Sequence, residues 1–361
     1  MRPPTRRCLT LILIFLLTFG SLELSLRWLT PFSPQPLKSL LSESAQHSFS
    51  NRRLHGTWKN GTAILLPPIE TKDVLFVGDS FPFGSYVKEE NTFPVRFETL
   101  TGRTIVNLGV PATGLGSYNR MLEVGHSYHP RQVFYCIFSN DFSDEGPPPS
   151  RPLFIANGTK SLPGDSRLFL RKLSLRQQAK DAIKQIIHAS LAYRLFNQWL
   201  HAGSFHSLPT FWEKHFFLFA HKDFADRVLQ DPAAEIRLEA VAELIREAHK
   251  FTSHWPSQFT VVLLPPKEFV YGPLLGEAGK LMYEDAHYRR FQKLMRLLDA
   301  SKISYIDTTP FLRKRAAEKV KLYFSIDGHF SEEGHNAVSE LLATYPLISS
   351  ISTRGFLKSF P

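Results

Sequence analysis

Cysteine is almost absent from this sequence, since Cys8 and Cys136 are the only two among 361 residues. Two thiols exclude a disulfide-dense scaffold and a zinc site built from several cysteines. They lie in different apolar segments, and we expect no bridge between them. Metal ligands of other kinds are scarce too, because His126 and His129 precede Pro130 and no carboxylate cluster joins them at ligand spacing. We therefore expect neither a metal nor another cofactor.

Acidic residues are fewer than basic ones. Lys and Arg number 43 against 33 Asp and Glu, which gives a net charge of +10. This balance favours anionic partners such as phospholipid headgroups, acidic glycans or nucleic acid. Nucleic acid is the weakest of the three, because no zinc-finger, RRM or Walker A pattern is present. With 43% hydrophobic and 21% charged residues, the chain is not disordered, collagen-like or a coiled coil.

An apolar segment at the N-terminus sets the expected compartment. Arginines precede an uncharged run from Cys8 to Leu22, and Glu23 and Arg27 follow at the spacing of a pair on one helix face. Read through to Leu29, this helix is long enough to cross a bilayer core of about 30 Å. We expect residues 1–30 to form a cytoplasmic leader and an uncleaved membrane anchor, with the rest of the chain periplasmic or extracellular. A cleaved signal peptide is the alternative, because the fully apolar part is short.

The next part of the chain predicts an α/β fold. Residues 31–72 are rich in Pro and Ser and predict a tether with an irregular lead-in. Three apolar runs typical of buried parallel strands follow, with a plausible helix in each interval. This β-α-β-α-β order predicts a doubly wound parallel sheet. The expected strands are Asp73–Val77, Thr104–Leu108 and Gln132–Phe138, and the expected helices are Thr92–Leu100 and Ser117–Ser127.

The second half of the chain continues the same domain, which we expect to span residues 73–348, with a tail at 349–361. We interpret residues 150–255 as a helical insertion between strands, because the period is helical from about Leu168 to Ala220 and again from about Ala233 to Phe251. Strand character then resumes, and helices and strands alternate to the end of the domain. The expected elements are a strand at Gln258–Leu264, a helix at about Lys280–Ala300, a strand at Ile303–Ile306 and a helix at about Glu332–Leu342.

A serine follows the first strand. Val77 leads into Gly78-Asp79-Ser80, a glycine-containing turn that would expose a hydroxyl at the carboxyl edge of a parallel sheet. A serine in that place can be a nucleophile if a base lies near it. The tripeptide alone is weak, because Gly164-Asp165-Ser166 repeats it in a polar loop that no strand precedes. We interpret Ser166 as a chance match.

Polar or glycine-rich loops also follow the next two strands. Residues Asn107–Gly114 are dense in Gly and Pro, which predicts a tight loop. Asn140 ends the third strand, where its amide can donate to a developing oxyanion, although Asn-Asp is also good turn chemistry. The carboxyl ends of parallel strands meet at one edge of the sheet, so all three loops are expected to converge there.

A histidine and an aspartate lie near the C-terminus, in Asp327-Gly328-His329. Ser331 is a good N-cap for the last helix, which places His329 in the loop before it. A loop histidine beside an aspartate can act as a general base with its orienting acid. We expect His335 to lie in the helix as a packing or surface residue. Asp307, at the end of a strand, is an alternative acid, although a turn role before Pro310 fits it better.

Together these segments resemble the SGNH (GDSL-type) hydrolase superfamily, and most closely its bacterial membrane-anchored members, which begin with a single apolar helix. The resemblance covers roughly residues 20–145 and 255–345 and implies a flavodoxin-like fold without a cofactor. The segments that carry it are Gly78–Gly84, Asn107–Pro111, Asn140-Asp141, Ile306–Pro310 and Tyr323–His335.

The resemblance implies a catalytic triad in which Ser80 is the nucleophile, His329 its base and Asp327 the orienting acid. It implies an oxyanion hole made of the backbone N–H of Ser80, a backbone N–H at Ala112 and the side chain of Asn140. Asp79 and Asp141 would be structural supports, and Gly109 or Gly114 could replace Ala112 as the donor. The chain departs from the family pattern where Phe138 and Ser139 precede Asn140, and where Ile326 occupies the usual position of the acid.

Three functions fit these residues. The first is a membrane-anchored serine esterase that deacylates an O-acylated glycan or lipid of the bacterial cell envelope. The second is an O-acyltransferase that uses the same triad on a cell-surface polysaccharide. The third is a catalytically inactive scaffold of an exopolysaccharide system. The expected partners are the acylated substrate, the membrane through the N-terminal helix, and the envelope polysaccharide machinery.

Overall fold

The computed structural model describes most of the two regions that carry the motifs. The described residues are 6–29, 54–58, 61–66, 68–111, 113–142, 153–156, 205–212, 215–220, 234–275, 289–324 and 327–345.

The centre of the molecule is a five-stranded sheet in which every pairing is parallel. Numbered in chain order, the strands lie 2-1-3-4-5 across the sheet. The first and third strands are therefore neighbours, and the direction in which successive strands are added to the sheet changes between them. This confirms the predicted doubly wound sheet. The spatial order is β10 (Ser304–Asp307), β9 (Gln258–Leu264), β5 (Gln132–Phe138), β3 (Val74–Val77) and β4 (Ile105–Asn107).

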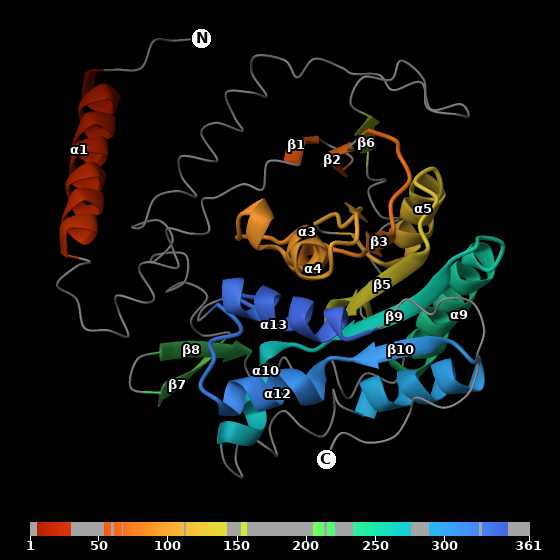
Figure 1. Ribbon diagram of the computed structural model, residues 1–361. Coiled ribbons are helices and arrows are strands. Elements are labelled where there is room, and N and C mark those ends of the chain that lie inside the picture. Colours follow the sequence, from red (N-terminus) through yellow and green to blue (C-terminus); the bar gives the residue numbers. More distant parts are fainter. Residues whose placement is uncertain are drawn as a thin grey trace.

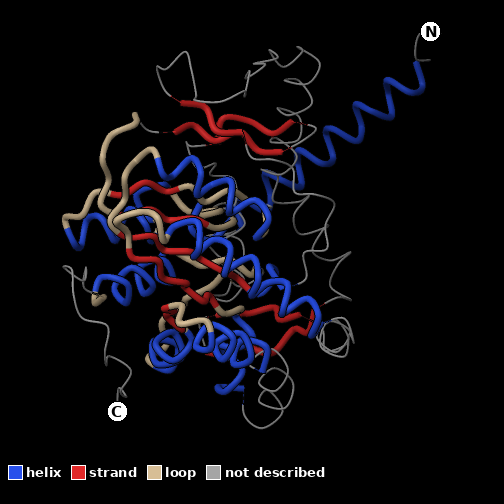
Figure 2. Tube along the Cα trace, turned by 90° about the vertical axis from the view of Figure 1, so that its right-hand side faces the viewer, coloured by secondary structure: helices blue, strands red, loops and turns tan. Residues whose placement is uncertain are grey.

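Helices cover both faces of this sheet, as Figures 1 and 2 show. The side chains of β3 alternate between two cores, with Leu75 and Val77 facing one and Val74 and Phe76 facing the other. Every residue of β3 is buried, which is why the strand reads as a continuous apolar run. The first core packs against α5 (Leu115–His126) and α9 (Ala234–Thr252), and the second against α4 (Phe93–Thr101), α12 (Thr309–Ala317) and α13 (Glu332–Ala343).

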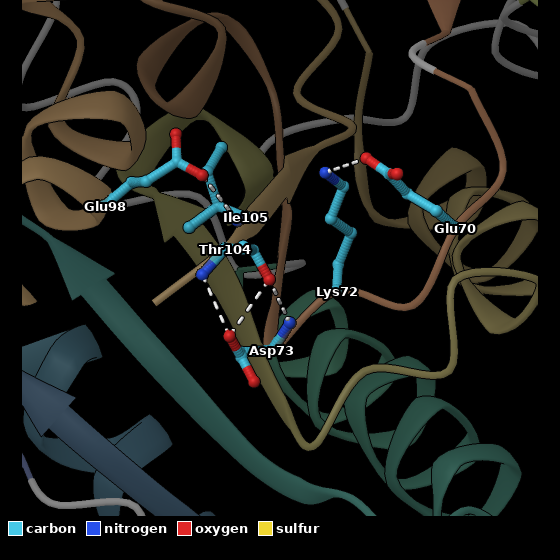
Figure 3. A network of polar contacts seen from close by, with 6 residues as sticks. All are labelled: Glu70, Lys72, Asp73, Glu98, Thr104 and Ile105. Carbon is cyan, nitrogen blue, oxygen red and sulfur yellow. Dashed lines mark hydrogen bonds and ion pairs between the residues drawn. The ribbon is translucent and has the colours of Figure 1, made fainter. Parts of the chain in front are cut away.

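A polar network fastens the amino ends of the first two strands (Figure 3). The Asp73 carboxylate accepts from the N–H and the hydroxyl of Thr104, each at 2.9 Å. The Glu98 carboxylate on α4 accepts from the N–H of Ile105 at 3.1 Å. Lys72 and Glu70 form an ion pair beside them at 2.5 Å. The Asp73–Thr104 contacts join the starts of β3 and β4 at the sheet edge opposite to the predicted site.

Two β structures lie where other structure was predicted. A hairpin of β1 (Leu54–Trp58) and β2 (Gly61–Leu66), with β6 (Leu153–Ala156) parallel to β2, corrects the expected irregular lead-in. The signal for it was Asn60-Gly61 between two β-prone runs.

The second is a hairpin of β7 (Phe205–Trp212) and β8 (His215–Ala220), which corrects the expected helical period up to Ala220. Its Phe and Trp residues favour strands, and Pro209 is incompatible with a helix interior. The helix predicted at Ala233–Phe251 is confirmed by α9, whereas residues 168–204 lie outside the described residues.

The remaining helices agree largely with the sequence. A helix was predicted at Lys280–Ala300, and its described part is 289–300. The last helix agrees with α13 to within a residue. Asp307 has the turn role expected before Pro310, because its Oδ1 accepts from the N–H of Thr309 two residues further on. The helix α12 begins at Thr309, and proline at the first helical positions is well tolerated.

The N-terminal segment forms α1 (Arg6–Leu29), red in Figure 1. The predicted pair of Glu23 and Arg27 is present, with Arg27 Nε 2.7 Å from Glu23 Oε1. Within the part of the chain that the structure describes, no helix combines the length and the apolar character that a membrane crossing requires.

Candidate active site

The turn that carries Ser80 is shaped by two neighbours in sequence. A Cβ at Gly78 would lie 2.7 Å from Pro82 Cγ and 2.9 Å from the carbonyl oxygen of Cys136, so this position requires glycine. Asp79 is buried and caps the short helix α3 (Ser80–Phe83), because its Oδ1 accepts from the N–H of Phe81 at 2.9 Å. Ser80 is therefore presented at the start of α3, directly after β3.

The loop after β4 is fastened to this turn. Asn107 Nδ2 donates to the carbonyl oxygen of Pro82 at 2.6 Å, and Asn107 Oδ1 accepts from the N–H of Gly109 at 2.9 Å. A Cβ at Gly109 would lie 2.4 Å from the main-chain nitrogen of Phe83, so the close approach of these two loops leaves no room for a side chain at Gly109. Gly114 is the N-cap residue of α5. Ala112, the predicted oxyanion donor of this loop, lies outside the described residues.

The loop after β5 forms a 3-10 turn, η3 (Ser139–Phe142), which contains Asn140. Asp141 is buried and holds this turn: its Oδ2 accepts from the N–H of Phe138 at 3.0 Å, and its Oδ1 accepts from the hydroxyl of Tyr118 at 3.1 Å. Asp141 therefore joins η3 to the end of β5 and to α5. The side chain of Asn140 lies outside the described part of the chain.

The third component is the loop that connects Tyr323 to Phe330, which we call the acid–base loop. These two residues form an antiparallel bridge, and the N–H of Phe324 donates to the carbonyl oxygen of His329 at 3.1 Å. Ser331 caps α13 as predicted, because its Oγ accepts from the N–H of Gly334 at 3.2 Å. The bridge and the cap fix both sides of the loop that carries Asp327 and His329.

The structure brings Ser80, His329 and Asp327 into one hydrogen-bonded line. His329 Nε2 lies 2.8 Å from Ser80 Oγ, and His329 Nδ1 lies 2.5 Å from Asp327 Oδ1. The same carboxylate oxygen accepts from the N–H of His329 at 2.7 Å. A hydroxyl bonded to an imidazole that a carboxylate orients is the arrangement by which serine nucleophiles are activated.

Charges around His329 act in opposite directions. Burial favours the neutral ring, but the charge and the hydrogen bond of Asp327, with a contribution from Asp79, outweigh it and raise the pKa of His329 above its ordinary value. The positive charge of Lys267 opposes this rise in the pKa of His329. Because Asp327 accepts the proton on Nδ1, the neutral ring has its lone pair on Nε2, facing Ser80 Oγ.

Aromatic rings enclose the imidazole on two sides. Phe81 stacks on His329 with ring centroids 5.2 Å apart and planes inclined at 28°, and Tyr86 meets it edge-on at 5.2 Å and 81°. Tyr86 has φ of 70°, in the left-handed region that a tyrosine adopts only under constraint. Sequence reasoning missed both Tyr86 and Lys267. The position of Lys267 just after the buried strand β9, at the same sheet edge, was the available signal.

The other candidates of the sequence have different surroundings. Asp307 Oδ1 accepts from the N–H of Thr309 at 2.9 Å, two residues further on, which is the predicted turn role and not that of the triad acid. His335 lies in α13 as expected, and of the two roles left open, packing or surface, the structure shows packing: the side chain is buried and its Nδ1 accepts from the N–H of Phe93 at 3.2 Å. Ser166 lies outside the described residues. Among the residues that are described, no three His, Cys, Asp or Glu side chains gather where a metal ion could be held.

Residues 218–349 match the family model of the SGNH hydrolase-like domain of the acetyltransferase AlgX. The matched span contains Asp327 and His329, whereas Ser80 precedes it. No curated protein matches the sequence.

Solved structures with low sequence identity are similar to the chain over most of its length. One is a protein from Desulfitobacterium hafniense DCB-2 that is assigned to the lipolytic G-D-S-L family and is 13% identical in sequence. The alignment covers 76% of this chain and 98% of that chain, with a TM-score of 0.40. Another is a catalytic mutant of Axe2, an acetylxylan esterase from Geobacillus stearothermophilus, with 12% identity, 78% and 99% covered, and a TM-score of 0.39.

Proposed function

We propose that this chain is a serine esterase that removes acyl groups from an O-acylated glycan or lipid of the cell envelope, and the match of residues 218–349 to an SGNH hydrolase-like family model supports this. The observation that carries the proposal is the 2.8 Å contact between Ser80 Oγ and His329 Nε2, with Asp327 on the other side of the ring.

In the proposed reaction, Ser80 Oγ attacks the ester carbonyl carbon while its proton passes to His329 Nε2. Asp327 stabilises the resulting imidazolium through Nδ1. The oxyanion would be held by the backbone N–H of Ser80, a donor of the second loop and Asn140. The intermediate then collapses, and the proton on Nε2 leaves with the alcohol of the substrate. A water molecule repeats the sequence on the acyl-enzyme, gives its proton to Nε2, and releases the acid and free Ser80.

O-acyl transfer is the second candidate, and the match to the AlgX acetyltransferase family model favours it. The acyl-enzyme would form in the same way, but a sugar hydroxyl would replace water in the second half-reaction. The number of bonds made and broken is the same, so the two activities differ only in which nucleophile reaches the acyl carbon. The net charge of +10 suits an anionic glycan or lipid headgroup as the substrate.

The location is a further part of the proposal. The arginine leader and the uncharged run from Cys8 to Leu22 support export of the SGNH domain, with the N-terminal segment holding it at the membrane. Fractionation of cells that produce the full chain, with and without alkaline carbonate extraction, tests this. Recovery of the full-length protein in the cytoplasmic fraction contradicts the proposed location.

The test of the activity is hydrolysis of p-nitrophenyl acetate by the full chain and by its Ser80→Ala variant. Ser253→Ala, which removes an exposed hydroxyl in the turn after α9, is the matched control. We expect turnover that is lost with Ser80 and kept with Ser253. Adding a glycan acceptor and measuring acylated product separates transfer from hydrolysis. Equal rates for the protein and Ser80→Ala, together with no labelling of Ser80 by a fluorophosphonate, would instead support an inactive scaffold.

A further inference from the structure

The mechanism above leaves one charged group at the site without a role. Lys267 is 3% exposed and begins the helix α10 (Lys267–Tyr271), which follows β9 at the same sheet edge as Ser80. Removing an ammonium group from water is costly unless it is paired and hydrogen-bonded. Lys267 Nζ donates to the main-chain oxygen of Asp327 at 3.1 Å. This buried charge is therefore directed at the residue that orients His329.

The segment around Lys267 contacts the acid–base loop and the residue before it in three places. At the base of the loop, the hydroxyl of Tyr323 donates to the carbonyl oxygen of Pro265 at 2.6 Å, and the N–H of Leu322 donates to the hydroxyl of Tyr271 at 2.8 Å. Lys267 makes the third contact at the tip, where Asp327 lies. The two tyrosine contacts lie at the base of the loop, whereas Lys267 contacts the residue that carries the acid.

The charges that face His329 suggest that use. Asp327 on its own loop and Asp79 at the start of α3 both favour the protonated ring, and Lys267 on α10 disfavours it. His335 on α13 is also close, but burial lowers its pKa to about 3, so it is neutral near neutral pH. Burial also lowers the pKa of Lys267, while Glu268 and Asp327 act to keep it charged. Among the described residues, Lys267 is the charged group that offsets the two carboxylates.

We propose that Lys267 is a positioning residue for the catalytic pair: its ammonium group holds the main chain of Asp327 in place and offsets the negative charge around His329, so that Nε2 accepts the proton of Ser80 near neutral pH. Lys267 gives and receives no proton in the reaction and touches no reacting atom. The inference rests on the proposed function, because it assigns a role within the same site.

The experiment separates charge from hydrogen bonding with three substitutions. Lys267→Gln keeps a donor and removes the charge, Lys267→Met removes both, and Lys267→Arg keeps both. Lys321→Met is the matched control, because Lys321 is a half-buried lysine whose pKa burial also lowers and whose charge is not among those that shift the pKa of His329. For each full-length protein, kcat/KM for p-nitrophenyl acetate is measured from about pH 5 to about pH 9, a range that brackets histidine titration. The ¹³Cε1 resonance of His329, assigned with His329→Asn, is titrated in parallel.

We expect the acid limb of the rate profile and the His329 titration to move to higher pH in Lys267→Gln and Lys267→Met. Lys267→Arg and Lys321→Met are expected to keep the limb of the unsubstituted protein. The ratio of activity at about pH 6 to that at about pH 8 therefore falls in the two neutral variants only. A rate that drops equally at every pH, with an unmoved His329 titration, would show a merely structural role and overturn the proposal.

Failure of folding also gives an answer. If neither neutral variant gives the circular dichroism spectrum of the unsubstituted protein, the role of Lys267 is structural and the proposal is wrong. Failure of the proposed function is distinguishable from both results. In that case the unsubstituted protein shows no Ser80-dependent turnover, and the His329 titration alone decides whether Lys267 offsets the carboxylates.

Discussion

Replacing Gly109 by alanine is expected to displace the turn that presents Ser80. The added Cβ would lie 2.4 Å from the nitrogen of Phe83, 2.9 Å from the carbonyl carbon of Pro82 and 3.0 Å from Phe83 Cα. All three are main-chain atoms, so no side-chain rotation relieves the contacts. Since carbon atoms rest at about 3.5–4.0 Å from their neighbours, the two loops must separate by about 1 Å.

The displacement has a stability effect and a rate effect. Forcing an extra methyl group into a packed site lowers the free energy of unfolding by about 1–3 kcal/mol. Ser80 begins the same short helix that contains Phe83, so a shift of this turn also moves the nucleophile relative to His329. A misplacement of about 1 Å lowers the rate of a positioned reaction by about 10²-fold.

Gly125→Ala is the matched control for this substitution. Its Cβ would meet Leu75 Cδ2 at 2.4 Å, which is the far end of a flexible side chain in the core under α5. Urea unfolding and steady-state hydrolysis are measured for both variants. We expect both to lose stability, but only Gly109→Ala to lose kcat/KM by about 10²-fold. Gly109→Ala with the unsubstituted rate, or an equal loss of rate in both variants, would refute the reasoning.

Asp327→Asn is expected to lower kcat by on the order of 10³–10⁴-fold, because an amide no longer holds a proton on Nδ1 of His329, and steady-state kinetics on the folded variant measure this. His335→Gln is expected to remove an acid-sensitive part of the stability. Burial lowers the pKa of His335 to about 3 in the folded protein, whereas the pKa of an unfolded histidine is about 6.5. Between these two pH values only the unfolded chain binds the proton. The free energy of unfolding therefore decreases by up to about 1.4 kcal/mol for each unit of falling pH. Urea midpoints over that range check it, and an equally acid-sensitive variant contradicts it. Tyr118→Phe removes a hydroxyl that donates to Asp141, the residue that holds η3 and with it Asn140. We expect kcat to fall by up to about 10²-fold. Tyr305→Phe, which removes a hydroxyl away from the site, is expected to keep the unsubstituted kcat.

The parallel sheet could be predicted because its strands are buried on both faces. β3, β5 and β9 are apolar along almost their whole length, and burial of that kind leaves a continuous run in the sequence. The β1–β2 and β7–β8 hairpins lack this signal. Their short runs are compatible with strand or helix until a partner strand is present. The local marks are few: Asn60-Gly61 favours a hairpin, and Pro209 only disfavours a helix.

In the site, too, some residues could be predicted from the sequence and others could not. Ser80, Asp327 and His329 could be named because a motif and a loop position mark them, and the structure brings them together. Lys267 was not named, although it follows β9 at the same sheet edge, because a lysine after a strand is most often solvated. Its burial depends on the acid–base loop, whose tip at Asp327 lies 60 residues further along the chain. No local pattern encodes a contact of that kind.

The distance between Ser80 and His329 depends on a helix interface that neither residue belongs to. The two lie 249 residues apart in the chain and are joined by one hydrogen bond. Soon after the Ser80 turn comes α4, and soon after His329 comes α13, and these helices are bonded to each other through Phe93 with His335 and Arg96 with Asn336. Each half of the site is held locally, and the α4–α13 contact acts together with the stacking of Phe81 on His329 to bring the nucleophile to its base. Substitution of His335 is therefore expected to change the distance between Ser80 and His329 as well as the stability of the fold.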